Sequence, residues 1–416
     1  MTDTCYVQAA KLLTVAQAKQ HIRLAIQEIA ERESVAIGAA LGRILADDLH
    51  SAVDIPPQRN AAMDGYAFSS RQLIADQAVE LQEVGTAWAG KPYQGSIGPN
   101  QCVRIFTGAV VPESADSVIA QEQIQRVGNS IHFPPGTQPF KNIRAAGSDV
   151  KQGEVLVTAP KRLSPADLGL LAAAGISSVA VKRRLKIGFF STGDELSALG
   201  NPLRTGQIYD SNRYMLSGLL NDANHICTDL GVIADDSELL EHTLLSAAEQ
   251  FDVLISSGGA SVGDADFVKQ ALEKCGRVNF WKLAIKPGKP LAFGRIKNCW
   301  FFGLPGNPIA VLVTYRQFVK PALAQLAGNT AEMPLQLKAR CESALRKSPG
   351  REEYQRGILR QTAPGEFAVK SAGPQDSHQL KVASLANCFI VLDSACAGVS
   401  AGESVTVEPF DAFLSE

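Results

Sequence analysis

The segment Phe251–Cys275, FDVLISSGGASVGDADFVKQALEKC, combines three local patterns in order. A short apolar run that ends in Val253-Leu254-Ile255 is typical of a strand buried in a parallel sheet. The glycine-rich run SSGGASVG comes next, and near Asp264 the apolar residues take on the period of an amphipathic helix. The segment therefore predicts a strand, a glycine loop and a helix.

The glycine loop has the composition of an anion site. Gly258 and Gly259 let backbone N–H groups close on an anion, and the start of the next helix adds the positive end of its dipole. Asp264 and Asp266 would repel a phosphate unless a divalent cation lay between them. The combination indicates a phosphate ester with Mg²⁺. For a glycine loop alone, a plain turn capped by Asp is the commoner explanation, so other segments must decide.

Length and composition restrict the class of protein. The 416 residues predict about two to four domains. The net charge of −2 argues against a nucleic-acid-binding surface, and no apolar run approaches the length of a membrane span. Eight cysteines are scattered without a metal-binding spacing, and the first residues lack the pattern of a signal peptide. We expect a soluble, cytoplasmic protein with reduced thiols and with neither nucleic acid nor membrane among its partners.

The first part of the chain predicts helices around a small β domain. Apolar spacing predicts an amphipathic helix over 14–33 and a second short helix over 39–45, which the prolines after Asp54 end. Short strands are expected at 103–106, 117–120 and 130–133. Ser164, Pro165 and Asp167 have the pattern of a capped helix start, and Gly175 closes that helix.

The second part predicts an α/β domain followed by a β-rich end. Strands are expected at 185–190, 230–233, 251–255 and 300–304, and the first three place carboxylates at one sheet edge, where ligands collect. These carboxylates, which could be helix caps but are more economically read as ligands, are Asp194, Glu195, Asp235, Asp264 and Asp266. Lys282, Lys286 and Lys289 lie on a turn where they can converge, and Pro305-Gly306-Asn307-Pro308 opens a helix with a kink expected at Pro321. From residue 331 onward, short strands between turns predict a β-barrel-like domain.

Five stretches, taken in order, resemble one family. They are NAAMDGYA (60–67), RIFTGAVVPESADSVIAQE (104–122), STGDEL (191–196), the SGG-containing loop and the segment 281–308 with its KPGKP and GLPGNP elements. Together they are similar to the MoeA family of molybdopterin molybdenumtransferases, to which the gephyrin E domain also belongs. NIRAAGSD (142–149) matches a further family pattern, with Ala145 and Ala146 in place of expected basic residues and Ala61 where the family usually has Ser.

The resemblance implies a multidomain α/β protein. Its central, doubly wound α/β domain binds molybdopterin and is expected over 183–330. A helical and β scaffold that also dimerises would comprise 1–55 and 147–182, with a small inserted β domain at 56–146. A C-terminal β-barrel domain would occupy 331–416.

The implied activity is insertion of molybdate into adenylyl-molybdopterin with Mg²⁺-dependent release of AMP; water and a molybdate oxygen are both open as nucleophiles. Catalytic residues implied by the resemblance are Asp64, Thr107, Asp149, Glu195, Asp235 and Asp266, and Glu195 and Asp266 are the implied metal ligands. Residues implied to bind the substrate are Ser257, Gly258, Gly259, Ser261, Lys282, Lys286, Pro305, Pro308, Arg356 and Ser377. Lysines and helix-start amides suit molybdate because it is a tetrahedral dianion, like sulfate.

The resemblance also implies partners. It implies a homodimer with shared active sites, an adenylyltransferase that supplies adenylyl-molybdopterin, and downstream molybdenum-cofactor proteins. One alternative is that adenylyltransferase itself, which shares the SGG-containing domain but is typically a single short domain. Another alternative is a pterin carrier or gephyrin-type scaffold without turnover.

Overall fold

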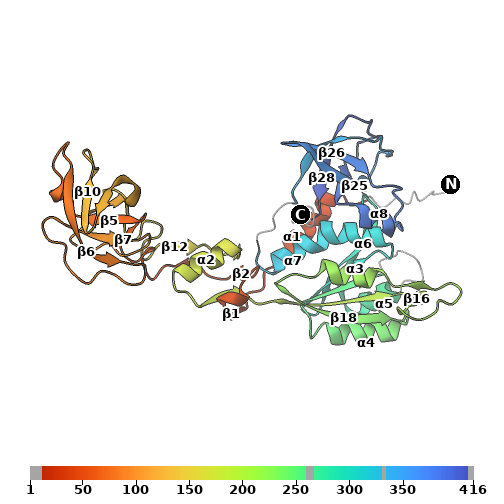
Figure 1. Ribbon diagram of the computed structural model, residues 1–416. Helices are drawn as coiled ribbons and strands as arrows, with labels where there is room; N and C mark the ends of the chain where they lie inside the picture. Colours follow the sequence, from red (N-terminus) through yellow and green to blue (C-terminus); the bar gives the residue numbers. More distant parts are fainter. Residues whose placement is uncertain (1–11, 259–266, 330–333, 411–416) are drawn as a thin grey trace, which may run out of the picture. The chain divides into compact units, whose positions relative to one another are not determined.

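The computed structural model describes residues 12–258, 267–329 and 334–410, and the chain forms two compact units (Figure 1). Unit 1 comprises residues up to 33, 42–44 and the chain from 181 onward, and unit 2 comprises 34–41 and 45–180. Within the described ranges, no helix is both long and apolar enough to cross a membrane. The seven cysteines described there are all free thiols, as expected.

Unit 1 contains the α/β domain, whose six-stranded sheet has the order β18-β15-β19-β23-β22-β20. Its strands are β15 (Leu185–Thr192), β18 (His225–Ile233), β19 (Val253–Ser257), β20 (Gly276–Lys282), β22 (Pro290–Ile296) and β23 (Cys299–Leu304). The first three and β23 run parallel, β22 is antiparallel to β23, and the edge strand β20 is antiparallel to β22 and so runs in the same direction as the first four. The carboxyl ends of β15 and β19 therefore lie side by side, with Ser191 opposite Ser257.

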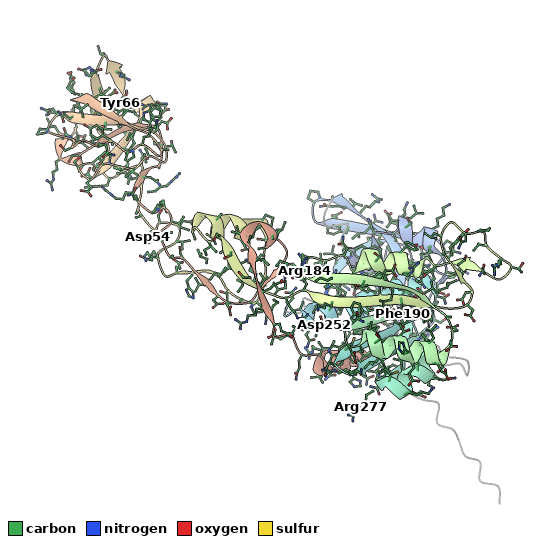
Figure 2. All side chains as sticks on the ribbon, turned by 90° about the horizontal axis from the view of Figure 1, so that it is seen from below. Asp54, Tyr66, Arg184, Phe190, Asp252 and Arg277 are labelled. Carbon is green, nitrogen blue, oxygen red and sulfur yellow. The ribbon has the colours of Figure 1, made fainter. Side chains whose placement is uncertain are left out.

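Helices cover both faces of this sheet (Figure 1). They are α3 (Asn212–Leu219), α4 (Ser237–Ala247), α5 (Phe267–Cys275), α6 (Pro308–Thr314) and α7 (Lys320–Leu326). Alternate strand residues separate two cores: Phe189 and Ile255 pack with α3, α6 and α7, whereas Phe190 and Leu254 pack with α4 and α5. Figure 2 shows Phe190 inside this layered domain and Asp252 just before β19.

The N-terminal helix α1 (Val15–Ala25) is shorter than predicted. Thr14 and Gln17 form a capping box at its start, and Val15, Ala18 and Ile22 pack into the core of unit 1. The helix ends where Ile26 takes an extended backbone, although Ile26 and Ile29 still contribute to the same core. The apolar spacing therefore identified the buried face correctly but not the end of the helix.

A π-helical turn, η4 (Tyr315–Val319), separates α6 from α7. Pro321 follows it and has no N–H to donate to the preceding turn, so the regular hydrogen-bond ladder cannot continue unbroken. The helix is irregular near Pro321, as expected, but the irregular turn lies before the proline rather than at it.

The C-terminal part of unit 1 is a closed β-barrel. Its strands are β24 (Leu337–Cys341), β25 (Glu352–Ala363), β26 (Glu366–Ser371), β27 (Cys388–Leu392) and β28 (Ser404–Pro409). They follow the order β25-β26-β24-β28-β27, and an additional β25–β27 pairing closes the ring. The short strand β21 (Ile285–Lys286) leaves the α/β domain and pairs with the start of β25. This pairing places the 285–290 turn against the barrel.

Unit 2 contains a six-stranded sheet in the order β8-β5-β7-β6-β10-β9. Its strands are β5 (Gly65–Phe68), β6 (Val79–Ala87), β7 (Gln101–Ile105), β8 (Ser117–Ala120), β9 (Gln125–Val127) and β10 (Ser130–Phe133). Ala67 and Val103 pack on one face, whereas Tyr66, labelled in Figure 2, and Phe68 pack on the other. The short strands expected from the sequence are confirmed.

Outside that sheet, one predicted helix is confirmed and another is wrong. Helix α2 (Pro165–Ala173) begins with the expected capping box of Ser164 and Asp167. Residues 39–45 form no α-helix: the 3₁₀ turn η1 (Ile37–Ala39) is followed by strand β2 (Ile44–Leu45). The short strands β1 (Arg32–Ala36), β13 (Lys161–Arg162) and β14 (Ser178–Lys182) join β2 in a four-stranded sheet. Pairing with distant strands has overridden the local helical pattern there.

Candidate active site

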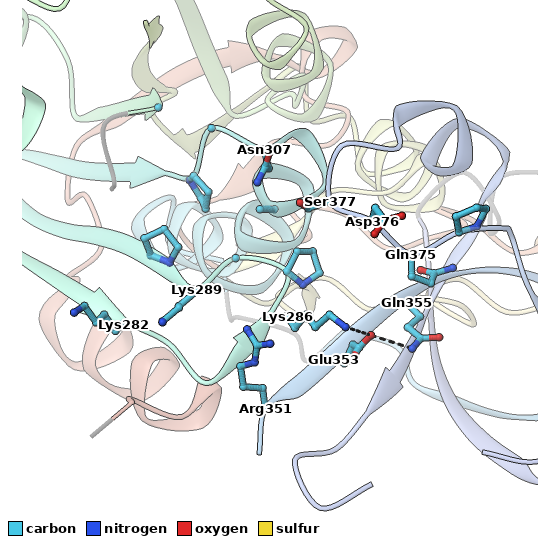
Figure 3. A pocket seen from close by; sticks show the side chains of 18 of the residues that line it. Lys282, Lys286, Lys289, Asn307, Arg351, Glu353, Gln355, Gln375, Asp376 and Ser377 are labelled. Carbon is cyan, nitrogen blue, oxygen red and sulfur yellow. Dashed lines mark hydrogen bonds and ion pairs between the residues drawn. The ribbon is translucent and has the colours of Figure 1, made fainter. Parts of the chain in front are cut away.

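A cavity of about 1040 Å³ lies in unit 1 between the carboxyl edge of the α/β sheet and the β-barrel (Figure 3). This volume is enough for a large substrate. Its polar lining on the α/β side includes Thr192, Glu195, Asp235, Lys282, Lys286, Lys289 and Asn307. On the barrel side it includes Arg346, Arg351, Glu353, Gln355, Gln375, Asp376 and Ser377. Several of the predicted site residues are thus brought together.

Gly258 lines the cavity at the end of β19 and has a φ of +93°. A Cβ atom there would lie 2.7 Å from the carbonyl oxygen of Thr192, so only glycine fits this turn. Its N–H donates to the carbonyl of Leu304 at 3.2 Å and is therefore not free for an anion, contrary to the expectation from the sequence. The predicted residues Gly259, Ser261, Asp264 and Asp266 lie outside the described residues.

Ser257 is buried at the end of β19 and does not line the cavity. Its hydroxyl has no hydrogen-bond partner among the described residues. The same is true of the Ser191 hydroxyl on the neighbouring strand and of Asn212 Oδ1 at the start of α3. Because buried polar atoms are rarely left unpaired, these three are open to a water molecule or a ligand group.

Three carboxylates gather at the ends of β15 and β18. Glu195 and Asp235 line the cavity, and the Asp235 N–H points at Asp194 Oδ1 over 3.4 Å. Burial, followed by the negative charges of Asp194 and Glu195, raises the pKa of Asp235. Within the described ranges, no three His, Cys, Asp or Glu side chains are placed so that they could hold a metal ion. The predicted ligand Asp266 is outside those ranges.

Positive side chains face the carboxylates from the 282–290 turn. Lys282, Lys286 and Lys289 all line the cavity, and Figure 3 shows the Lys286 side chain directed to Glu353, away from Lys282. Gly288 has a φ of +111°, and a Cβ atom there would lie 2.7 Å from Thr314 Cγ2 on α6. The turn therefore packs closely against that helix. Arg351 adds a further cation from the barrel side.

The start of α6 forms the floor between these groups. Pro305 and Asn307 line the cavity, whereas Pro308 is the first helical residue and is not part of the lining. The Asn307 side chain makes no capping bond, and the Asn212 amide donates to the Gly306 carbonyl at 2.7 Å. The segment is thus anchored by a neighbouring helix rather than by its own cap.

Arg356 does not reach the cavity, in contrast to the expectation that it binds substrate. It follows Glu353 and Gln355 on β25, and alternation along the strand turns it to the other face. Its fully buried guanidinium donates to the carbonyls of Pro374, Gln375 and Asp376 at 2.9, 3.2 and 3.0 Å. Arg356 therefore holds the loop that presents Ser377 to the cavity.

Glu353 and Gln355 are cavity residues that the sequence did not single out. Both are buried, with exposures of 4% and 3%, and Gln355 Nε2 donates to Glu353 Oε1 at 3.0 Å. Lys286 Nζ lies 3.2 Å from the same carboxylate oxygen (Figure 3). Polar residues at alternate positions of a predicted barrel strand were the available signal, because such positions are normally apolar when buried.

The remaining predicted residues belong to unit 2. Asp64 Oδ1 accepts hydrogen bonds from the Thr107 backbone N–H at 2.8 Å and the Thr107 hydroxyl at 2.7 Å. These bonds hold the pKa of Asp64 below its ordinary value. Asp149 is exposed, and its N–H donates to the Ile55 carbonyl. The structure thus joins Asp64 to Thr107, and within the described part of the chain no hydrogen bond or ion pair joins either of them to Asp149.

Beside that pair, Trp88 stacks on Phe106 with ring centroids 3.9 Å apart, and the Arg104 guanidinium lies over the Phe106 ring. Trp88 remains 50% exposed. The stacked pair therefore leaves an amphipathic ring beside Thr107 accessible to a ligand.

Comparison with known proteins agrees with the fold. Family models match along the chain as the MoeA N-terminal region (domain I and II) over 13–175, a probable molybdopterin binding domain over 188–325 and the MoeA C-terminal region (domain IV) over 338–410. The molybdopterin molybdenumtransferase of Haemophilus influenzae is 43% identical over 97% of this chain and 100% of its own length. That of a Nostoc species is 35% identical over 91% of this chain and 88% of its own. The crystal structure of the molybdopterin biosynthesis moeA protein from Pyrococcus horikoshii OT3 superposes with a TM-score of 0.83 at 28% identity, covering 96% of this chain and 100% of that one.

Proposed function

The chain belongs to the MoeA family, and we propose that in its cavity molybdate is inserted into adenylyl-molybdopterin with release of AMP. Transfer of molybdenum to molybdopterin is the activity named for its curated relatives and is the activity of this chain. The observation that carries the proposed route is that one large cavity is lined by cations from the 282–290 segment and the barrel, here called the cationic side, and by Glu195 and Asp235 from the ends of β15 and β18, here called the carboxylate side. An anionic phosphate ester and a metal oxyanion both have suitable surroundings there.

The cationic side suits molybdate. Lys282 and Lys289 form no ion pair with any described residue, so their ammonium groups are available to a dianion. Arg351 supplies a planar group that can bind two oxygens of one anion. The Ser377 hydroxyl adds a neutral donor on the barrel side.

We place Mg²⁺ on the carboxylate side. Burial raises the pKa of Asp235, the negative charges of Asp194 and Glu195 raise it further, and a divalent cation would offset part of the cost of ionising this side chain. Glu195 and Asp235, with Asp266 from outside the described residues, would hold the ion. When bound, Mg²⁺ would neutralise charge on the phosphoryl group as the adenylate is cleaved. The protein's own part is to hold the phosphate beside these acids and the molybdate beside the lysines.

The direct test supplies the purified protein with adenylyl-molybdopterin, molybdate and Mg²⁺ and follows AMP and molybdenum cofactor together. We expect equal amounts of both products and loss of both with a chelator or with Glu195→Gln. Cofactor formation without AMP, or full activity after chelation, would overturn the proposed route. Binding of the pterin without turnover would favour a carrier or scaffold instead.

The proposed reaction also implies partners. We propose that an adenylyltransferase supplies its substrate and that molybdenum-cofactor proteins accept its product in the cytoplasm. We further propose a homodimer in which each active site takes residues from both subunits. The Asp64–Thr107 pair supports this proposal, because neither residue lines the cavity of unit 1 within the same chain.

A further inference from the structure

Glu353 is a buried carboxylate in the wall of a cavity suited to anions. It is 4% exposed and sits on β25, where Gln355 Nε2 donates to its Oε1 at 3.0 Å. Gln355 is itself fixed, because the same amide nitrogen donates to the Arg346 carbonyl at 2.9 Å. The strand and its neighbour therefore hold this negative charge in place.

Lys286 is the lysine that Glu353 engages. Its Nζ lies 3.2 Å from Glu353 Oε1, and 47% of its side chain remains exposed to the cavity side (Figure 3). Lys282 and Lys289 line the same cavity without an ion pair to any described residue. One of the three lysines that line the cavity is thus already paired, while its flexible stem leaves it free to turn.

We propose that Glu353 competes with a bound oxyanion for the ammonium group of Lys286 and thereby sets the affinity of the cavity for oxyanions. With no anion bound, its carboxylate holds Lys286, and an entering tetrahedral dianion must take the ammonium from Glu353 and tolerate a fixed negative charge nearby. Binding is weaker than the lysines alone would give, so the oxyanion is exchanged rather than retained. This inference rests on the proposed oxyanion site in the same cavity.

The test measures binding of tungstate, a tetrahedral oxyanion, to the full-length protein by calorimetry without pterin or nucleotide. Glu353→Gln keeps the shape and the Gln355 contact but removes the charge, so we expect binding roughly two- to fivefold tighter. In a Lys286→Gln background the same change should have much less effect. Asp376→Asn is the matched control: it removes an exposed cavity carboxylate that has no ion pair with a described residue, and we expect a smaller gain.

A purely structural role for Glu353 would give weaker or unchanged binding in Glu353→Gln, and that result would overturn the inference. An equal gain in the Lys286→Gln background would overturn the competition for Lys286. If Glu353→Gln does not fold, Glu353→Asp replaces it, because the shorter stem withdraws the carboxylate from Lys286 and should also tighten binding. Absence of tungstate binding in the wild type and every variant would refute the oxyanion site of the proposed function, which is a distinct result.

Discussion

Asp235 is placed where its negative charge costs stability. Its pKa is raised by burial and by the charges of Asp194 and Glu195. A raised carboxyl pKa means that the folded state binds the proton more tightly than the unfolded chain. The stabilisation is present below the unfolded pKa of about 3.9 and is lost as the pH rises through the folded pKa. At neutral pH the ionised side chain therefore destabilises the protein when no cation is bound.

We predict that Asp235→Asn raises the melting temperature of the metal-free protein by about 1–2 °C at pH 7, with no gain below about pH 4. The same variant should lose AMP release, because the amide cannot replace a charged cation ligand. The matched control is Asp236→Asn next to it, whose Oδ1 caps α4 through the N–H groups of Glu238 and Leu239. Asparagine caps a helix as well as aspartate does, so stability and activity should stay unchanged. A lower melting temperature in Asp235→Asn would contradict the repulsion.

Residue types predicted the charge of the site better than the role of each side chain. Lysines on a proline- and glycine-containing turn and acids at strand ends do line one cavity, because both follow from local sequence and sheet topology. Residue types alone could not show that Glu353 lines the cavity and that Arg356 does not. Their roles depend on the face of β25 on which each lies, and the sequence alone does not give the register of a barrel strand.

At the scale of elements, the loop 374–377 depends on one buried side chain. The Arg356 guanidinium binds three successive carbonyls of this loop, and the Ile309 N–H on α6 binds the Ser377 carbonyl at 3.1 Å. Lysine has a single ammonium group and cannot reach three carbonyls in this planar arrangement. We predict that Arg356→Lys lowers the free energy of unfolding by about 2 kcal/mol and speeds amide hydrogen exchange in the loop.

The control for this prediction is Arg360→Lys on the same strand. The Arg360 side chain is 55% exposed and pairs only with Glu342 among the described residues. Surface ion pairs contribute little, so the change should be within about 0.5 kcal/mol. Chemical denaturation compares the two variants, and similar losses in both would show that Arg356 has no special role in the loop.

Elements with a complete local signal were predicted well. Helix α2 has its cap, its first-turn proline and its closing glycine within 12 residues of sequence, and the structure has it as expected. Residues 39–45 had apolar spacing but no cap, and pairing within a sheet decided their conformation. The cavity itself depends on the pairing of β21 with β25, residues 285 and 352 being partners. No local pattern encodes a pairing over that separation.

At the scale of the whole molecule, the candidate residues fall into two groups. Every residue that lines the cavity belongs to unit 1, whereas Asp64, Thr107 and Asp149 belong to unit 2. The proposed homodimer gives both groups a place in one active site, because each subunit would supply unit 2 residues to the cavity of the other. An active site shared between subunits would behave differently on subunit exchange from a site contained within one subunit.

We predict that two inactive variants, Asp64→Ala and Glu195→Ala, restore activity to one another when their subunits are exchanged. Half of the dimers formed at equal mixing are heterodimers. In each of them one shared site carries both lesions and the other carries none, so roughly a quarter of wild-type activity should return under two-fold symmetry. AMP release measured before and after exchange gives the result, and a tagged subunit captured with its untagged partner verifies that exchange took place. If each site lay within one subunit, every site would keep a lesion, and activity would stay absent after verified exchange.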